Sequence, residues 1–138
     1  MSLEIASYRD ALFDGVDALW REAFPDATPR NRAAASIPAK LKVQPELFLV
    51  GLDGETVVGT VMAGYDGHRG WLYSVAVAKS HQRKGVGSAL VREAEARLRA
   101  LGCLKINLQV MPENAAVAEF YKGLGFVVEE RISMGKLT

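Results

Sequence analysis

The chain has 138 residues, 49% of them hydrophobic, which suffices for the core of one ordinary domain and excludes a disordered or fibrous protein. Its 17 lysines and arginines nearly balance 16 aspartates and glutamates, so no strong net field directs it to nucleic acid or an anionic membrane. The single cysteine cannot form a disulfide within the chain. Because the sequence shows neither a long apolar run nor a signal-peptide pattern, we expect one cytoplasmic domain over residues 1–138.

The first half alternates strand and helix patterns around four prolines, so we expect it to be rich in loops. A short strand is expected over residues 4–8 and a helix over 12–23, ended by Pro25. A second helix is expected over residues 32–41. Three apolar segments then predict an antiparallel meander with its first turn at Asp53-Gly54: residues 47–52, 56–65 and 71–78.

The second half changes to a helical period. Apolar residues spaced by three or four predict a helix over residues 86–101, with Gly102 at its C-terminal end. Alternation from Leu104 to Val110 predicts a strand, and Asn114 is expected to cap a last helix that Gly125 closes. With a final strand over residues 126–132, the predicted order is β-α-α-β-β-β-α-β-α-β.

The clearest chemical signal lies in residues 73–90, where a predicted strand enters a basic, glycine-containing loop and then a helix. The unpaired N–H groups at a helix start and the positive end of the helix dipole both favour an anion. Gly85 and Gly87 allow the backbone to approach a ligand closely, and Arg83 and Lys84 add positive charge. The loop therefore predicts a phosphate or pyrophosphate site.

Spacing separates three phosphate-binding motifs. A dinucleotide fingerprint needs a third glycine where Leu90 stands, and the glycine-lysine pair of a P-loop is absent. The remaining pattern, Gln82-x-x-Gly85-x-Gly87, resembles the acetyl-CoA pyrophosphate loop of the GNAT superfamily of N-acetyltransferases. Taken alone, the hexapeptide is equally typical of a tight strand-to-helix turn.

A second block extends the resemblance. Asn114 followed by Phe120-Tyr121-Lys122-Gly123-Leu124-Gly125-Phe126 looks like a later block of the same family, with Val117 where alanine is usual. Residues 59–70 resemble a subgroup of small stand-alone bacterial members. The match covers residues 47–134 and is less sharp over the first 45 residues.

The resemblance implies an α/β (α+β) fold with a mixed central sheet flanked by helices, in which parallel strands over 71–78 and 104–110 splay apart. It also implies that acetyl-CoA is bound, with its pantetheine arm in that gap and the backbone near Val75 polarising the thioester carbonyl. The residues that the resemblance assigns to acetyl-CoA are Val75, Ala76, Val77, Gln82, Arg83, Lys84, Gly85, Val86, Gly87, Ser88, Asn114 and Tyr121.

Tyr121 occupies the family position of the general acid that protonates the departing thiolate, although by spacing alone it is a core aromatic residue. The general base is left open between Asp66, Glu46 and Tyr73. Asp66 is better suited to a turn, because it precedes a glycine. Asn114 combines a helix cap with a secondary role toward the pantetheine.

We expect no metal, because His68 and His81 lie in separate predicted loops without other ligands at suitable spacing. Cys103 has no histidine partner near it in the sequence, which favours direct attack by an amine without an acyl-enzyme. The resemblance therefore predicts a cytoplasmic, bacterial, acetyl-CoA-dependent N-acetyltransferase. Its acceptor is expected to be a primary amine, with a small molecule favoured.

Two alternatives stay open. A protein N-terminus or lysine is a second acceptor class, because the loop and helix also resemble ribosomal-protein N-acetyltransferases, and a non-catalytic acyl-CoA sensor is the other. Acceptor choice is expected to lie in residues 66–70 and in the proline-rich first half. No nucleic-acid or membrane partner is expected, and a homodimer is left open because no apolar stripe identifies an interface.

Overall fold

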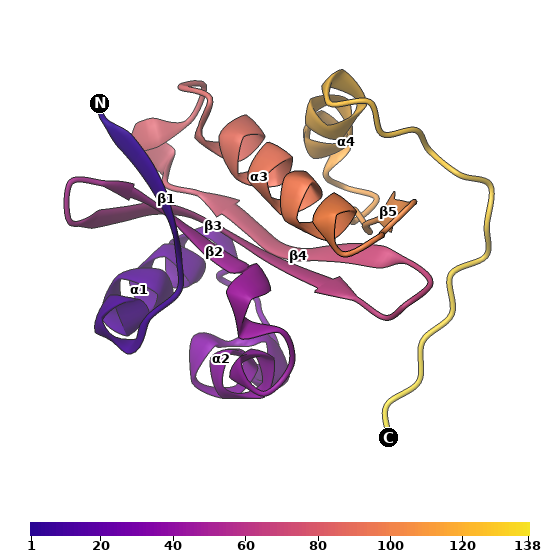
Figure 1. Ribbon diagram of the computed structural model, residues 1–138, viewed down its shortest axis with the longest axis horizontal. Coiled ribbons are helices and arrows are strands. Elements are labelled where there is room, and N and C mark those ends of the chain that lie inside the picture. The colour runs from indigo at the N-terminus through magenta and orange to yellow at the C-terminus, as the bar shows by residue number, and fades with distance from the viewer. The chain divides into compact units, whose positions relative to one another are not determined.

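The computed structural model describes residues 1–138 and contains five strands and four α-helices (Figure 1). The chain divides into two compact units, Met1–Leu108 and Gln109–Thr138, so a single domain over the whole chain stays a prediction. The elements are β1 (Leu3–Ser7), α1 (Phe13–Ala23), α2 (Ala33–Leu41), β2 (Phe48–Asp53), β3 (Thr56–Tyr65), β4 (Gly70–Val77), α3 (Val86–Ala100), β5 (Ile106–Asn107) and, in the second unit, α4 (Ala115–Gly123).

The sheet has the strand order β1-β2-β3-β4-β5, which confirms the predicted meander and the predicted parallel pair. The first four strands pair antiparallel, and β4 and β5 run parallel. The parallel ladder is short, since only Gly70 and Trp71 of β4 pair with β5. Beyond Trp71, the edge of β4 that faces away from β3 has no strand partner.

Helices cover both faces of this sheet, with α1 and α2 on one face and α3 on the other (Figure 1). The face under α1 and α2 carries an apolar cluster of buried residues, in which Trp20 of α1 stacks against Phe48 of β2 with ring centroids 6.0 Å apart. None of the helices has the length and hydropathy that a membrane crossing requires.

Glycines let α3 pack closely on its face of the sheet. An added Cβ at Gly59 of β3 would lie 2.7 Å from Leu90 Cδ1 and 2.8 Å from Val86 Cγ1. At Gly70 of β4 an added Cβ would lie 2.8 Å from Cys103 Sγ. All three distances are shorter than real Cβ contacts, so α3 rests on bare backbone at Gly59, and Cys103, which follows α3, rests on bare backbone at Gly70.

Substituting Gly59 by alanine is expected to destabilise the protein by about 1–3 kcal/mol, because the added methyl group overpacks the contact with α3. Gly64→Ala is a matched control on the same strand, since its Cβ would meet nothing closer than 3.8 Å. Urea unfolding of the two variants measures the difference. Equal midpoints for both variants would show that α3 does not constrain Gly59.

The helix boundaries follow the sequence signals, and the hairpin turn differs by one residue. Helix α1 ends at Ala23, two residues before Pro25, as predicted. Asp53 still pairs with Thr56, so the two-residue loop is Gly54-Glu55 and not Asp53-Gly54. Gly54 has a φ of +62°, which fits the requirement of a tight hairpin for left-handed backbone.

Two expected strands near the C-terminus differ from the structure. The strand predicted over residues 104–110 is only Ile106–Asn107, because β4 offers a parallel partner at just two residues. The strand predicted over residues 126–132 does not form. Its apolar residues Val127 and Ile132 are 77% and 91% exposed, and no neighbouring strand pairs with them. Apolar residues alone do not satisfy the backbone hydrogen bonds of a strand, so the segment stays irregular.

Candidate functional site

The loop between β4 and α3 presents free backbone N–H groups at a helix start. After β4 and a short 3₁₀ turn at Lys79–His81, α3 begins at Val86, with Gly85 at the N-cap position and no side-chain cap. Gly85 has a φ of +84°, and nothing lies within 4 Å of where its Cβ would stand. Left-handed Gly85 followed by helical Val86 turns successive N–H groups toward one point, an arrangement that binds anions.

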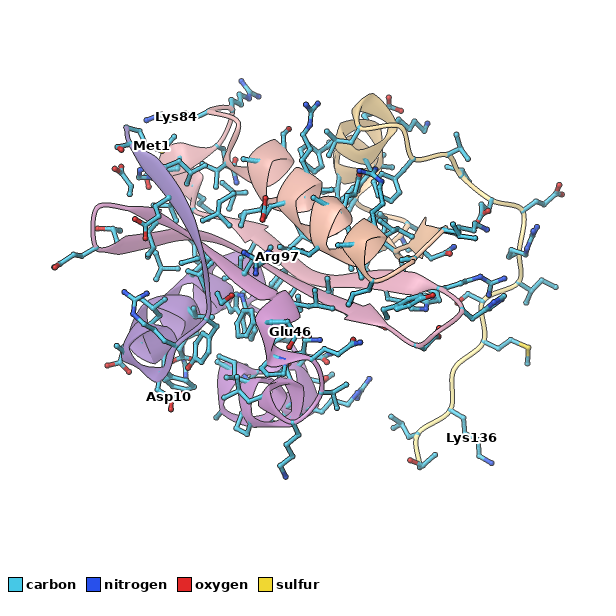
Figure 2. The ribbon with its side chains drawn as sticks, in the orientation of Figure 1. Met1, Asp10, Glu46, Lys84, Arg97 and Lys136 are labelled. Carbon is cyan, nitrogen blue, oxygen red and sulfur yellow. The ribbon has the colours of Figure 1, made fainter.

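Basic side chains surround this helix start. Gln82, Arg83 and Lys84 are all exposed, and Figure 2 shows Lys84 at the tip of the loop. Arg83 itself has a φ of +62°, so two of the three residues from Arg83 to Gly85 have left-handed backbone. Within the helix, Val86 and Gly87 are buried and Ser88 is half-buried, so Val86 and Gly87 can offer a ligand only their backbone.

Two hydrogen bonds hold the start of the loop in place. His81 Nε2 lies 2.9 Å from Asp53 Oδ2 at the tip of the β2–β3 hairpin, and the bond from His81 lowers the pKa of Asp53. The backbone N–H of Lys79 donates to Glu22 Oε2 of α1 at 3.2 Å. The loop is thus tied to the hairpin and to α1 before it reaches Gly85.

Strand β4 contains a bulge where the sequence predicts contacts to pantetheine. Tyr73 pairs with Met62 and Ala76 with Thr60, so Ser74 and Val75 together stand opposite one residue of β3. Ser74 has a φ of +49°, a left-handed conformation that costs a non-glycine residue about 1–2 kcal/mol. Bulges that re-aim the backbone are over-represented next to active sites.

A buried chain of hydrogen bonds ends on this bulge. The indole N–H of Trp20 donates to Thr60 Oγ1 at 2.8 Å, and Thr60 Oγ1 donates to the carbonyl oxygen of Ser74 at 2.9 Å. Thr60 is fully buried and Trp20 is 3% exposed. A donor or acceptor left unpaired at this depth costs about 1–3 kcal/mol, so the three groups hold one another in place.

The aromatic residues that precede the bulge lie beside the β3–β4 loop. The rings of Trp71 and Tyr73 stack with centroids 6.5 Å apart, and Tyr73 is 54% exposed. Burial of the hydroxyl and the charge of Asp66 raise the pKa of Tyr73. Asp66 Oδ1 accepts the backbone N–H groups of His68 and Arg69, both at 2.7 Å, and these bonds lower the pKa of Asp66. Asp66 thus makes the bonds of a turn residue and is a weak base.

The second unit carries the other two residues of interest. Tyr121 of α4 is 8% exposed, and its ring meets Phe120 and Phe126 edge to face at 5.0 and 5.7 Å. Burial raises the pKa of Tyr121 to about 12, so the phenol keeps its proton at neutral pH. Asn114 occupies the N-cap position of α4, but its side chain makes no capping bond, contrary to expectation. Its backbone carbonyl accepts the N–H of Val117 instead.

The sequence predicts a ligand loop over residues 82–88 that follows a strand containing residues 75–77. In the structure, residues 75–77 end β4, and residues 82–88 follow after the short turn at Lys79–His81. Sequence reasoning missed Trp20 and Thr60, which hold the bulge, and the tie from His81 to Asp53. One signal for Thr60 was available, because it is the one hydroxyl between the two ends of an otherwise apolar strand. The other ties join residues that lie far apart in the sequence.

The remaining chemistry-bearing side chains are dispersed. No three histidine, cysteine, aspartate or glutamate side chains gather in a way that suits a metal ion. Cys103 is buried, and its thiol donates to the backbone carbonyl of Lys105 at 3.2 Å.

Comparison with known proteins identifies close relatives along the whole chain. A family model described as the acetyltransferase (GNAT) family matches residues 9–126. An N-acetyltransferase of Yersinia pestis, described as uncharacterized, is 38% identical over 134 residues, covering 97% of this chain and 94% of the relative. An acetyltransferase of Pectobacterium atrosepticum is similar to the same degree, with 38% identity and the same coverage.

Solved structures share the fold at low sequence identity. An N-acetyltransferase, PaiA, of Thermoplasma acidophilum, solved with coenzyme A, has a TM-score of 0.82 at 19% identity, covering 96% of this chain and 94% of that one. The aminoglycoside N-acetyltransferase AAC(6')-Iy, solved with CoA, has a TM-score of 0.80 at 16% identity, covering 99% and 95%.

Proposed function

The chain belongs to the GNAT family of acetyltransferases, and on that premise we propose that it transfers the acetyl group of acetyl-CoA directly to a small primary amine. The observation that carries this proposal is the uncapped start of α3 at Gly85, placed directly after the bulged, half-unpaired strand β4. The start of α3 suits a pyrophosphate, and the unpaired edge of β4 suits an extended arm with amide groups.

Backbone N–H groups from Gly85 to Ser88 would hold the pyrophosphate, with charge added by Arg83 and Lys84. A Cβ at Gly85 would point into open space, so the bare backbone leaves room for a phosphate oxygen. The free edge of β4 over residues 75–77 would meet the amides of the pantetheine as an added strand does. Gln82, Asn114 and Tyr121 complete the set by their family positions.

The reaction forms a bond between the amine nitrogen and the thioester carbonyl carbon and breaks the bond from that carbon to sulfur. A backbone N–H near Val75 donates to the carbonyl oxygen, where negative charge grows during attack. The hydroxyl of Tyr121 donates to the sulfur as it leaves. Burial raises the pKa of Tyr121 to about 12, so the phenol still carries its proton when the sulfur begins to leave and can serve as the general acid. In the overall reaction the nitrogen loses one proton and the sulfur gains one, so the products are the acetylated amine and the free thiol of CoA.

A small acceptor is supported by the stacked aromatic pair of half-buried Trp71 and exposed Tyr73, which lies on β4 immediately before the bulge. Flat rings bind compact cations and aromatic amines through their faces. The bonds of Asp66 favour its turn role over that of the base. We propose that the amine loses its proton to water, with Tyr73 or Glu46 lining the path.

Acetyl-CoA at a hundred times its dissociation constant is expected to stabilise the folded protein by about 2.7 kcal/mol. Thermal unfolding across a titration of acetyl-CoA measures this shift. A screen of primary amines and N-terminal peptides, with release of free thiol as readout, then identifies the acceptor class. If millimolar acetyl-CoA does not raise the unfolding temperature, the proposal is contradicted.

The same screen separates the alternatives. Thiol release only with peptides would assign the chain to protein acetylation. Binding of acetyl-CoA without release for any amine would favour a non-catalytic sensor, in which Tyr121 has a packing role alone.

A further inference from the structure

The hydroxyl of Thr60 joins the core of the protein to the bulge in β4. It accepts the indole N–H of Trp20 and donates to the carbonyl oxygen of Ser74, so both of its hydrogen-bonding functions are used. Trp20 is itself fixed, because it is buried in the apolar cluster and stacks on Phe48. The position of the Ser74 carbonyl is therefore set from within the core.

The peptide bond from Ser74 to Val75 carries this constraint outward. The bond is trans, since the chain has no cis peptide, and in a planar trans peptide the N–H points opposite to the C=O. The carbonyl of Ser74 points to Thr60 on β3. The N–H of Val75 must then point away from β3, toward the edge of β4 that has no strand partner.

We propose that Thr60 is a positioning residue, which, anchored by Trp20, holds the N–H of Val75 toward the thioester carbonyl of acetyl-CoA. The inference rests on the proposed function. Ser74 adopts a left-handed backbone without being glycine, so the bulge needs support from its surroundings. Thr60 supplies this support through a bond that a regular antiparallel pair would not contain.

The carbonyl stretching band of bound acetyl-CoA, labelled with ¹³C at the carbonyl carbon, tests the proposal without any acceptor. A hydrogen bond to the oxygen lowers the frequency of this band. We expect binding to the wild-type protein to lower it and binding to Thr60→Val, which keeps the shape but loses the hydroxyl, to lower it by less than half as much. Thr60→Ser, which keeps the hydroxyl, is expected to restore the wild-type band.

Affinity provides the second readout, because Thr60 contacts β4 from the side of β3, opposite to the free edge. The dissociation constant for CoA, which lacks the carbonyl, is expected to change less than about threefold in Thr60→Val. Thr56→Val is the matched control, since Thr56 is exposed at the start of the same strand. It is expected to leave the band and the affinity unchanged.

A wild-type band in a folded Thr60→Val variant that binds acetyl-CoA would overturn the proposal. If Thr60→Val does not fold, as circular dichroism would show, Trp20→Phe takes its place, because it removes the indole N–H that orients Thr60 and keeps an aromatic ring beside Phe48. A wild-type band in that variant would also overturn the proposal. Failure of the wild-type protein to bind acetyl-CoA at all is a different result, since it appears in the titration and removes the proposed function itself.

Discussion

Substituting Gly85 by aspartate is expected to weaken acetyl-CoA binding by at least about a hundredfold, equivalent to about 2.7 kcal/mol. The new side chain would occupy the open space in front of the start of α3 and place a carboxylate where the pyrophosphate is proposed to lie. Like charges at such a distance repel strongly even near a protein surface. Isothermal titration of wild type and variant with acetyl-CoA measures the loss.

The matched control is Gly102→Asp at the opposite end of α3. Gly102 has a φ of +93°, close to the +84° of Gly85, and its Cβ would likewise meet nothing within 4 Å. The two variants therefore carry similar backbone strain and the same added charge. Retained affinity in Gly102→Asp together with its loss in Gly85→Asp would locate the anion at the start of α3. Equal affinity in both variants would contradict that location.

The loss of one hydroxyl in Tyr121→Phe is expected to lower turnover by about 10²–10⁴-fold while leaving the dissociation constant of CoA nearly unchanged. The ring and its edge-to-face contacts with Phe120 and Phe126 remain, so the fold of α4 is preserved. Stopped-time assays of thiol release, with the acceptor identified in the amine screen, give the turnover numbers.

The pH dependence sharpens this prediction. Since burial raises the pKa of Tyr121 to about 12, the phenol is protonated at both pH 7 and pH 9, and the defect of Tyr121→Phe should be the same at both. Tyr65→Phe removes a hydroxyl that donates to the carbonyl of Gly102 at 3.5 Å, and it is expected to leave turnover unchanged. A Tyr121→Phe enzyme with wild-type turnover would show that this hydroxyl only packs.

The elements that the sequence predicted well are those with a local physical cause. Helix α3 combines a regular apolar spacing with Gly102 in left-handed backbone, and α1 ends where Pro25 requires it. The meander alternates apolar strands with short turns. The strand predicted over residues 126–132 failed because strand formation depends on a partner, which lies elsewhere in the chain and leaves no mark on the segment itself.

In the candidate site, too, the features with a local cause were predictable and those that depend on distant residues were not. The loop from Gln82 to Ser88 was recognisable because glycine and charge at fixed spacing are local properties. The bulge at Ser74 was not, because it arises from a mismatch in register between β3 and β4 and is supported by Trp20, more than fifty residues earlier in the sequence. Asp66 was recognisable as a turn residue for the same reason as the loop, because it precedes a glycine, and its side chain accepts the backbone N–H groups of His68 and Arg69.

The pairing of β1 with β2 has a consequence for how the protein folds. The meander of β2, β3 and β4 closes through short turns, so its contacts form between neighbours in sequence. Joining Ser7 to Leu49 instead closes a loop of roughly forty residues, whose entropy must be lost before the pairing stabilises anything. Strand β1 is therefore expected to dock late, after α1 and α2 have collapsed onto the meander and brought its residues near the open edge of β2.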